Sequence, residues 1–314
     1  MPRLRVVSYN VRYFGHATRG LAATRGGMRR IANALAELEP LADVVCLQEV
    51  ETASVRAGFV QPVGGEGTQL TRFTSALHGA LAGRGRGERY HALYFPAHAY
   101  QLGGTPLYTT GLAVLVRDGV HVVRHNAEAP EDITHRRLAR VSTLKQTRVC
   151  AHVRVRVGGD AIDLFNTHLS LPAAFTPEFW TEPRRLGWGK NQLEEARAVE
   201  RFVAETRADS AGFVVLGDFN SLPGSPVYEH FVAKCKYRDA FGAFSRMTVD
   251  ELRAFPTAGF LNMRMHLDHV FSGPGVEWHD FDHTAAFGDR TSVFHRLSDH
   301  VPIVGTCSFG ASAG

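Results

Sequence analysis

The sequence predicts a mixed fold of strands and helices in which two β-sheets pack face to face with helices outside. Apolar segments rich in β-branched residues recur along the whole chain, whereas only three segments show helical periodicity. No internal repeat, long linker or change of composition divides the 314 residues. We therefore expect one domain spanning residues 1–314, although these observations alone allow several α/β or α+β arrangements.

The first part of the chain predicts a strand, a helix and a second strand. Residues 3–11 are expected to form the first strand. Residues 28–38 are expected to form a helix because Met28, Ile31, Leu35 and Leu38 recur at helical spacing, and Pro40 would stop it. A short apolar strand is predicted over residues 43–47.

A helix over residues 70–81 is expected to lead into a glycine- and arginine-rich run at residues 83–89. Basic runs of this kind can contact nucleic acid, but a solvated surface loop is the simpler interpretation. Further strands are predicted at residues 90–95 and 111–117.

The second half begins with a predicted hairpin, because Gly158-Gly159-Asp160 separates strands at residues 149–157 and 162–167. A helix follows over residues 191–206, with Leu193, Ala196, Val199 and Val203 along one side. The last predicted strands lie at residues 213–216, 267–271 and 301–307.

Composition is that of an ordinary globular protein, with 44% hydrophobic and 21% charged residues. No apolar run is long enough to span a bilayer, and the N-terminal residues lack the pattern of a signal peptide, so a cytoplasmic location is expected. The net charge of +4 is compatible with an anionic substrate. The four cysteines show no metal-ligand spacing, and Cys46, Cys150 and Cys307 are expected to be buried.

Polar residues follow apolar strands at several places along the chain. After the strand at residues 213–216, Asp218 and Asn220 lie two residues apart, so in extended chain both side chains leave on one face. A carboxylate beside an amide suits a water or an anionic oxygen around a hard cation, although Asp-x-Asn alone is most often a turn. The segments of this kind are Ser8-Tyr9-Asn10-Val11-Arg12, Cys46-Leu47-Gln48-Glu49-Val50, Phe165-Asn166-Thr167-His168-Leu169, Gly217-Asp218-Phe219-Asn220, Leu267-Asp268-His269-Val270 and Ser298-Asp299-His300-Val301-Pro302.

In content and order these segments resemble the motifs of the endonuclease/exonuclease/phosphatase (DNase I-like) superfamily, from about Arg3 to about Phe309. The resemblance implies a four-layer α+β sandwich, with helices outside two central, mostly antiparallel sheets. It also implies an Mg²⁺-dependent phosphoric ester hydrolase, for which Mn²⁺ should substitute. A histidine has a suitable pKa to take a proton from water, and a carboxylate partner fixes its tautomer.

The resemblance also assigns roles to individual residues. Catalytic roles fall to His300 as general base, Asp268 as its orienting partner, Asp218, which orients the water or assists the leaving group, and His168. Substrate phosphate would be contacted by Asn166, His168 and Asn220. Metal ligands would be Glu49, Asn10 and Asp299. We favour His300 over Asp218 as the base.

Two departures separate this chain from the AP-endonuclease branch, which has tryptophan before the first asparagine and tyrosine in place of His168. Here Tyr9 precedes Asn10, so the resemblance is to a non-AP-endonuclease branch. An aromatic and basic insertion follows at about residues 172–189, and we expect it to govern substrate choice. Its aromatic side chains suit base stacking or a lipid head group, or they cap the underlying sheet: Phe175, Phe179, Trp180 and Trp188.

Three functional hypotheses follow. The favoured one is a monomeric hydrolase of small or lipid-linked phosphoesters. The second is a DNase I-type nuclease acting on DNA or RNA, which would need a basic surface leading to the site, for which residues 83–89 and 136–140 are candidates. The third, an inactive binding protein on the same fold, is disfavoured because the acidic and histidine residues are all present.

Overall fold

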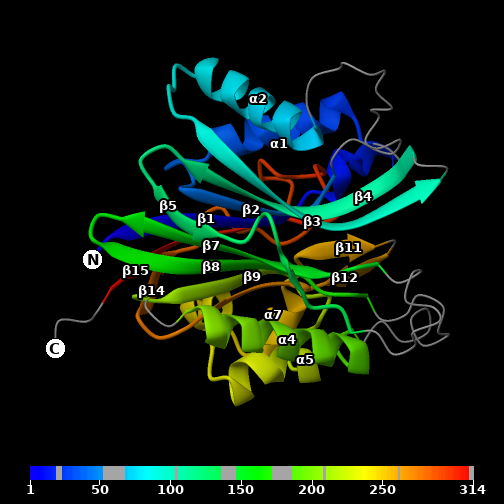
Figure 1. The fold of residues 1–314 in the computed structure, drawn as a ribbon, viewed down its shortest axis with the longest axis vertical. Helices are drawn as coiled ribbons and strands as arrows, with labels where there is room; N and C mark the ends of the chain where they lie inside the picture. Colours follow the sequence, from blue (N-terminus) through cyan, green and yellow to red (C-terminus); the bar gives the residue numbers. More distant parts are fainter. Residues whose placement is uncertain are drawn as a thin grey trace.

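The fold is a sandwich of two β-sheets between two layers of helices, as predicted (Figure 1). A computed structural model describes residues 1–18, 23–51, 68–102, 105–135, 146–171, 186–207, 210–260 and 262–310. Among them, no helix is long and apolar enough to cross a membrane.

The first sheet has six strands in the order β14-β15-β1-β2-β4-β3. Its strands are β1 (Arg3–Asn10), β2 (Val44–Val50), β3 (Tyr90–Leu102), β4 (Thr105–Arg117), β14 (Val276–Asp280) and β15 (Ile303–Phe309). Strands β1 and β2 are parallel and the other pairs are antiparallel. The last strand of the chain thus lies beside the first.

The second sheet runs in the order β10-β13-β9-β8-β7-β5, with β6 also paired to β7. Its strands are β5 (His121–His125), β6 (Glu131–Asp132), β7 (Val149–Val157), β8 (Asp160–His168), β9 (Phe213–Asp218), β10 (Arg238–Asp239) and β13 (Asp268–Ser272). Only β8 and β9 are parallel. A separate hairpin joins β11 (Ala258–Phe260) to β12 (Met263–Met265).

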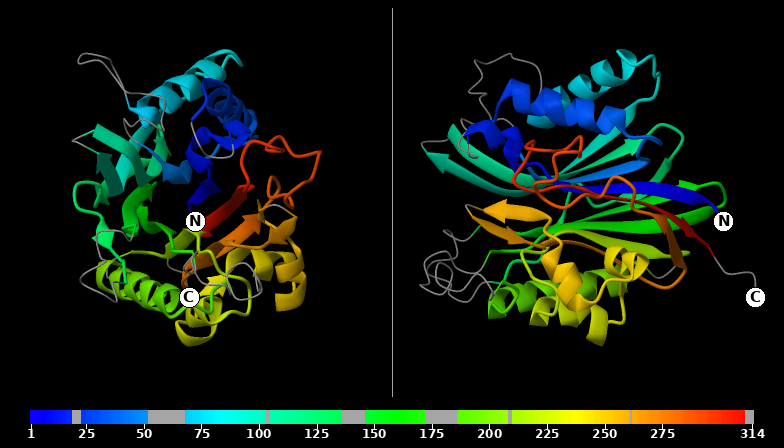
Figure 2. Two further views of the ribbon diagram at one scale, coloured as in Figure 1. Left: turned by 90° about the vertical axis from the view of Figure 1, so that its right-hand side faces the viewer. Right: turned by 180° about the vertical axis from the view of Figure 1, so that it is seen from behind.

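The helices form the two outer layers (Figures 1 and 2). The first sheet is covered by α1 (Arg25–Glu37) and α2 (Gln69–Ala82), and two short 3₁₀ segments, η1 (Arg12–Phe14) and η2 (His16–Thr18), follow β1. On the side of the second sheet lie α4 (Lys190–Thr206), α5 (Pro226–Glu229), the π-helical turn η5 (His230–Lys234), α6 (Ala240–Ser245) and α7 (Val249–Ala254).

Side chains alternate between the two faces of β1, and this places the polar side chains at its end between the two sheets. Leu4 and Val6 belong to the core that includes the second sheet, whereas Val7 and Tyr9 pack with α1 and α2. Because side chains alternate along a strand, Ser8 and Asn10 continue the inward-facing row of Leu4 and Val6. The same core buries Cys46, Cys150 and Cys307, as predicted.

Several elements are longer than the sequence predicts, α1 and β3 among them. Helix α1 begins at Arg25, because the Thr24 side chain accepts a hydrogen bond from the Gly27 amide at 2.9 Å. Strand β3 continues past Pro96 to Leu102, with a shift of register between Pro96 and His98. Both extensions pass through glycine or proline, which ordinarily indicate an end.

The basic run at residues 83–89 does not lead to the strand ends that carry the polar motifs. The Arg86 guanidinium donates to the Leu38 carbonyl at 3.1 Å and to Glu39 at 2.6 Å, which fastens the run to the end of α1. The Asp118 amide also donates to the Arg89 carbonyl at 2.9 Å. These partners lie at the end of the sandwich where β2 begins. The run therefore does not form a basic surface that leads to the strand ends with the polar motifs.

Candidate active site

The polar motifs meet at one edge of the sandwich, because β1 and β2 are parallel and so are β8 and β9. In the register, Asn10 lies opposite Gln48, and His168 lies opposite Asp218. The antiparallel β13 starts where β9 ends, with Asp268 opposite Asp218. The Asn10 amide donates to Asp218 at 3.0 Å, which joins the two sheets at this edge.

His300 and Asp268 form a close pair inside this edge. The His300 Nδ1–H donates to the Asp268 carboxylate at 2.8 Å, and the Asp268 amide donates to the Thr257 hydroxyl at 3.1 Å. His300 Nε2 then lies 3.7 Å from Asp218 Oδ2. Burial alone would lower the pKa of His300, but the carboxylates of Asp268 and Asp218 outweigh it and raise that pKa well above its usual value.

Two hydrogen bonds hold the Asp218 carboxylate. Its carboxylate accepts hydrogen bonds from the Asn10 side chain at 3.0 Å and from the Asn220 amide at 2.9 Å. Burial raises its pKa to about 7, and nearby Asp268 adds to the rise while His300 opposes it. The pKa of Asp218 and that of His300 therefore each depend on the charge of the other group.

Gly217 allows β9 to approach β8 at this point. Its φ of +143° is a conformation that side-chain-bearing residues rarely adopt, and a Cβ there would collide with the Thr167 carbonyl. The glycine therefore lets Asp218 come level with His168.

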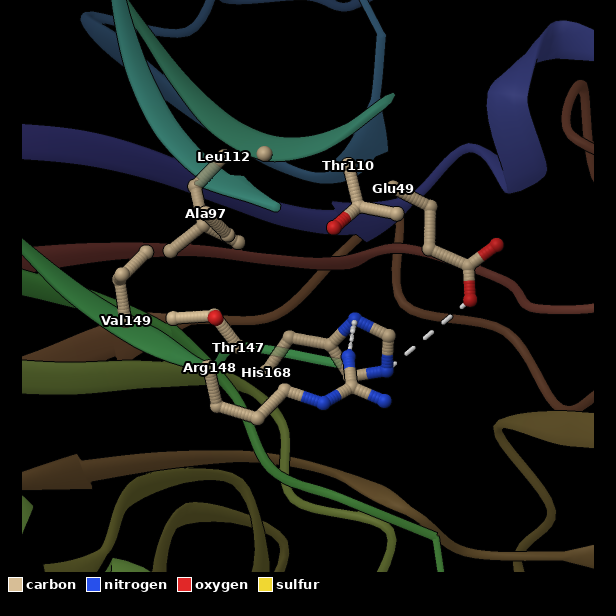
Figure 3. A pocket seen from close by; sticks show the side chains of 9 residues that line it. Glu49, Ala97, Thr110, Leu112, Thr147, Arg148, Val149 and His168 are labelled. Carbon is tan, nitrogen blue, oxygen red and sulfur yellow. Dashed lines mark hydrogen bonds and ion pairs between the residues drawn. The ribbon is translucent and has the colours of Figure 1, made fainter. Parts of the chain in front are cut away.

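His168 has its tautomer fixed by an arginine (Figure 3). The Arg148 guanidinium lies 3.1 Å from His168 Nδ1, and because a guanidinium can only donate, Nδ1 must accept. The proton of the neutral ring is therefore on Nε2, which faces Asp218 Oδ2 at 3.4 Å and Glu49 Oε1 at 3.9 Å. Burial, together with the charges of Arg148 and His300, lowers the pKa of His168 well below its usual value.

Glu49 is turned into the site by a break in the regularity of β2. Its φ of 57° is left-handed, and the register with β4 shifts between Leu47 and Val50. Its side chain is 20% exposed, which leaves the carboxylate accessible. Burial raises the pKa of Glu49, and the negative charge of Asp299 raises it further.

Asp299 and Asn10 complete the expected oxygen ligands, and both already have partners. The Arg12 guanidinium pairs with Asp299 at 2.7 Å, and the Arg12 amide donates to the Asn10 side-chain oxygen at 3.0 Å. The repulsion between Glu49 and Asp299 and their all-oxygen chemistry fit Mg²⁺ or Mn²⁺. In the described part of the chain, Asp218, Asp268 and His300 also form a cluster of metal-ligand type. Within that cluster, His300 Nδ1 already binds Asp268.

Asn166 is buried between the two sheets. It lies beneath the site, where its amide donates to the carbonyls of Leu47 at 3.1 Å and Ala113 at 3.3 Å, and its oxygen accepts from Gln48 at 2.7 Å. All these partners belong to the first sheet, so Asn166 joins the two sheets. These contacts give Asn166 a structural part between the sheets, and the phosphate contact that the resemblance implies for it stays a proposal.

Replacing Asn166 with alanine is expected to destabilise the fold, because it removes three buried hydrogen bonds. A loss of about 2 kcal/mol in the free energy of unfolding is expected, since each unsatisfied buried group costs about 1–3 kcal/mol. Urea denaturation measures the loss, and KM is measured alongside. A variant of unchanged stability whose KM is strongly raised would restore the phosphate role.

Asn220 lies at the mouth of the site. Its side-chain amide donates to the Leu169 carbonyl at 2.9 Å, and its carbonyl accepts from Gln192 at 2.8 Å. Its φ of 48° is left-handed, a conformation that asparagine tolerates better than most residues. These bonds fix the turn after Asp218 and leave a role in phosphate contact as a proposal.

Most of the aromatic insertion cannot be placed against the site. Residues 172–185, with Phe175, Phe179 and Trp180, lie outside the described residues, as does the basic run at 136–140. Of the remainder, Trp188 is 45% exposed just before α4. Its exposed indole leaves the expected role in substrate choice as a proposal.

Two arginines of the site, Arg148 and Arg12, are not among the residues expected from the sequence. A signal for Arg148 exists, because the hairpin at Gly158-Gly159 fixes the register of β7 against β8 and brings the start of β7 to His168. For Arg12 no signal exists, because its contact with Asp299 joins residues from the two ends of the chain.

The comparison with known proteins agrees with the family that the motifs resemble. Residues 7–300 match the Endonuclease/Exonuclease/phosphatase family. A comparison with curated proteins finds no match.

Several solved structures share the fold. The catalytic domain of human Nocturnin with bound sulfate superposes with a TM-score of 0.62 and 17% identity, over 98% of this chain and 94% of that one. ANGEL2, described as a 2′,3′-cyclic phosphatase, gives 0.58 and 16%, over 97% and 95%. Truncated TDP2 of Caenorhabditis elegans gives 0.55 and 17%, over 98% of both chains. At these identities the likeness shows the fold.

Proposed function

The chain belongs to the endonuclease/exonuclease/phosphatase family, and from that membership we propose that it hydrolyses a phosphodiester or phosphomonoester with a divalent metal ion. The observation that carries the proposal is the His300–Asp268 pair, 2.8 Å apart, beside the carboxylate of Asp218. This is a general base with its orienting acid, placed next to oxygen ligands suited to a metal.

In the proposed mechanism, Nε2 of neutral His300 takes a proton from the attacking water. Asp268 holds the Nδ1–H, so that Nε2 has its lone pair free, and it stabilises the imidazolium that forms. His168 donates its Nε2–H to a phosphoryl oxygen, because Arg148 holds its other nitrogen as an acceptor. Asp218 orients the water or assists the leaving group.

Glu49, Asn10 and Asp299 would hold the metal ion. When bound, Mg²⁺ supplies charge that polarises the phosphoryl group and neutralises the negative charge of the transition state. Binding at Asp299 requires Arg12, now 2.7 Å from that carboxylate, to share it or to move. Mn²⁺ would substitute, since it also prefers oxygen ligands.

The favoured substrate is a small or lipid-linked phosphoester, and the alternative is DNA or RNA. ANGEL2, which shares the fold, is described as a 2′,3′-cyclic phosphatase. The proposal also includes a single domain over residues 1–314, a monomer, a cytoplasmic location and an insertion at about residues 172–189 that selects the substrate.

A substrate panel tests the proposal. We expect Mg²⁺- or Mn²⁺-dependent release of p-nitrophenol from bis-p-nitrophenyl phosphate or p-nitrophenyl phosphate, and plasmid DNA, RNA and phospholipids separate the substrate classes. The His300→Ala protein serves as the control for a contaminating hydrolase. Failure to cleave any member of the panel with either metal would contradict the proposal.

A further inference from the structure

A second recess opens next to the proposed catalytic groups and carries positive charge. It is bounded by η2, by the β11–β12 hairpin and by the segment between β14 and β15. Ser298 and Val301, on either side of Asp299 and His300, contribute to its lining. The recess is therefore continuous with the edge of the sandwich where the polar motifs meet.

The charge of the recess comes from three arginines. The described residues that line it include no carboxylate: besides Ser298 and Val301 they are His16, Arg264, Phe287, Gly288, Arg290, His295 and Arg296. Guanidinium groups stay charged at any working pH and bind phosphate oxygens in pairs. Arg264, Arg290 and Arg296 are all exposed, so an incoming anion can reach them.

His16 contributes a buried ring nitrogen to the recess. Its Nδ1 atom is buried and has no hydrogen-bond partner in the described part of the chain. Burial lowers the pKa of His16, and the positive charges of Arg12, Arg30 and Arg296 lower it as well, whereas Asp299 opposes them. A polar ring atom without a partner, facing several cations, marks a place that an anionic or hydrated ligand would satisfy.

One wall of the recess is built on the strand that supports Asp299. The Phe287 ring packs so closely on Gly259 that no side chain would fit there, and the Phe287 amide donates to the Pro256 carbonyl at 2.6 Å. The Gly259 amide in turn donates to the Asp299 carbonyl at 2.8 Å. The Arg264 guanidinium lies 4.9 Å from the centre of the Phe287 ring, a cation–π contact that steadies the arginine.

We infer that this recess binds a second phosphate of the substrate, next to the phosphate that is cleaved. The inference rests on the proposed function and names its substrate class, a phosphoester that carries a further phosphate group. The Ser298 hydroxyl links the two places, because it lines the recess and donates to the Asn10 carbonyl at 2.8 Å. A second phosphate would accept hydrogen bonds from guanidinium groups that the cleaved phosphate alone would not reach.

Matched pairs of substrates that share one scissile phosphodiester test the inference by turnover. One pair is a thymidine dinucleotide with and without terminal phosphates, and the other is glycerophosphoinositol with and without a ring phosphate. We expect the extra phosphate to raise kcat/KM about tenfold or more in one pair, mainly through KM, which also identifies the source of the phosphate. In the Arg290→Ala/Arg296→Ala protein the advantage should fall to about twofold or less.

Equilibrium binding tests the recess even if no substrate is turned over. In His300→Ala protein, calorimetry should show thymidine 3′,5′-bisphosphate binding about tenfold more tightly than thymidine 5′-monophosphate. The matched control removes two exposed arginines at the opposite end of the sandwich, Arg84→Ala/Arg89→Ala, and should keep this preference. If the bisphosphate bound more tightly but the parent protein hydrolysed no substrate, the inference about the recess would be supported and the proposed function would be refuted.

The inference would be overturned by equal affinity for the two nucleotides. It would also be overturned if the Arg290→Ala/Arg296→Ala protein kept its preference, or if the Arg84→Ala/Arg89→Ala control lost it to the same extent. The last result would show that overall charge, rather than the recess, attracts the second phosphate.

Discussion

Replacing His300 with alanine is expected to lower kcat by about two to four orders of magnitude, the usual contribution of a positioned general base. The reason is the geometry of the pair, in which Asp268 holds Nδ1 at 2.8 Å and leaves Nε2 free for water. A slow residual rate from the bound metal should remain. Metal binding should be unchanged, because the expected oxygen ligands are separate residues, and this is the control.

Asp268→Asn should lower the rate and shift its pH dependence. The carboxylate of Asp268 is the strongest influence raising the pKa of His300 against the effect of burial, so its loss lowers that pKa. A base acts when it is deprotonated, so the ascending limb of the pH–rate profile should move to lower pH in Asp268→Asn and disappear in His300→Ala. Because the two residues act as a unit, the losses in the double variant should be far from additive.

Near-wild-type turnover in His300→Ala, with metal binding intact, would move the base role to Asp218. That residue is the alternative because burial raises its pKa to about 7. In that case Asp218→Asn should abolish the ascending limb, while His300→Ala should keep it and move it to higher pH, because the charge of His300 opposes the rise in the pKa of Asp218.

Glu49→Gln is expected to abolish metal-dependent turnover while preserving the fold. The substitution keeps the shape of the side chain and removes the charge that a hard cation requires. In metal-free protein the pKa of Glu49 is raised by burial and by Asp299, so loss of this charge relieves repulsion. The variant should therefore be at least as stable as the parent when a chelator is present.

Thermal unfolding with and without Mg²⁺ separates these effects. Mg²⁺ should raise the Tm of the parent, because it binds the folded chain, and should have little effect on Glu49→Gln. Since protons compete for the carboxylate, the stabilisation should also increase with pH. If both proteins gained the same Tm at the same Mg²⁺ concentration, or if the parent kept full activity after metal removal, the assignment of Glu49 would be wrong.

Alternation of side chains made the sheet layers and the inward-facing polar residues predictable. Asn10 and Asp218 continue rows of buried residues that the sequence displays, so their inward direction follows from period two. The same rule directed Asn166 inward but could not say how deep it lies. It is two residues short of the strand end, which places it between the sheets, with its hydrogen-bond donors already used.

Contacts between distant parts of the chain could not be predicted from the sequence, and neither could very short elements. The pairing of Arg12 with Asp299 depends on β15 returning beside β1, which no local pattern reveals. The bulge that turns Glu49 inward lies in β2, which contains no glycine that would have indicated it in the sequence. Strands such as β10 (Arg238–Asp239) contain too few residues for periodicity to show.

The place of β15 in the first sheet has a consequence for the order in which the protein is made. Strand β1 leaves the ribosome long before its partner β15, which spans residues 303–309. His300 lies just before β15, so the proposed proton acceptor joins Glu49 and Asp218 only after both of those residues have been synthesised. A chain made only up to that point would carry the proposed metal ligands Asn10 and Glu49 without the proposed general base.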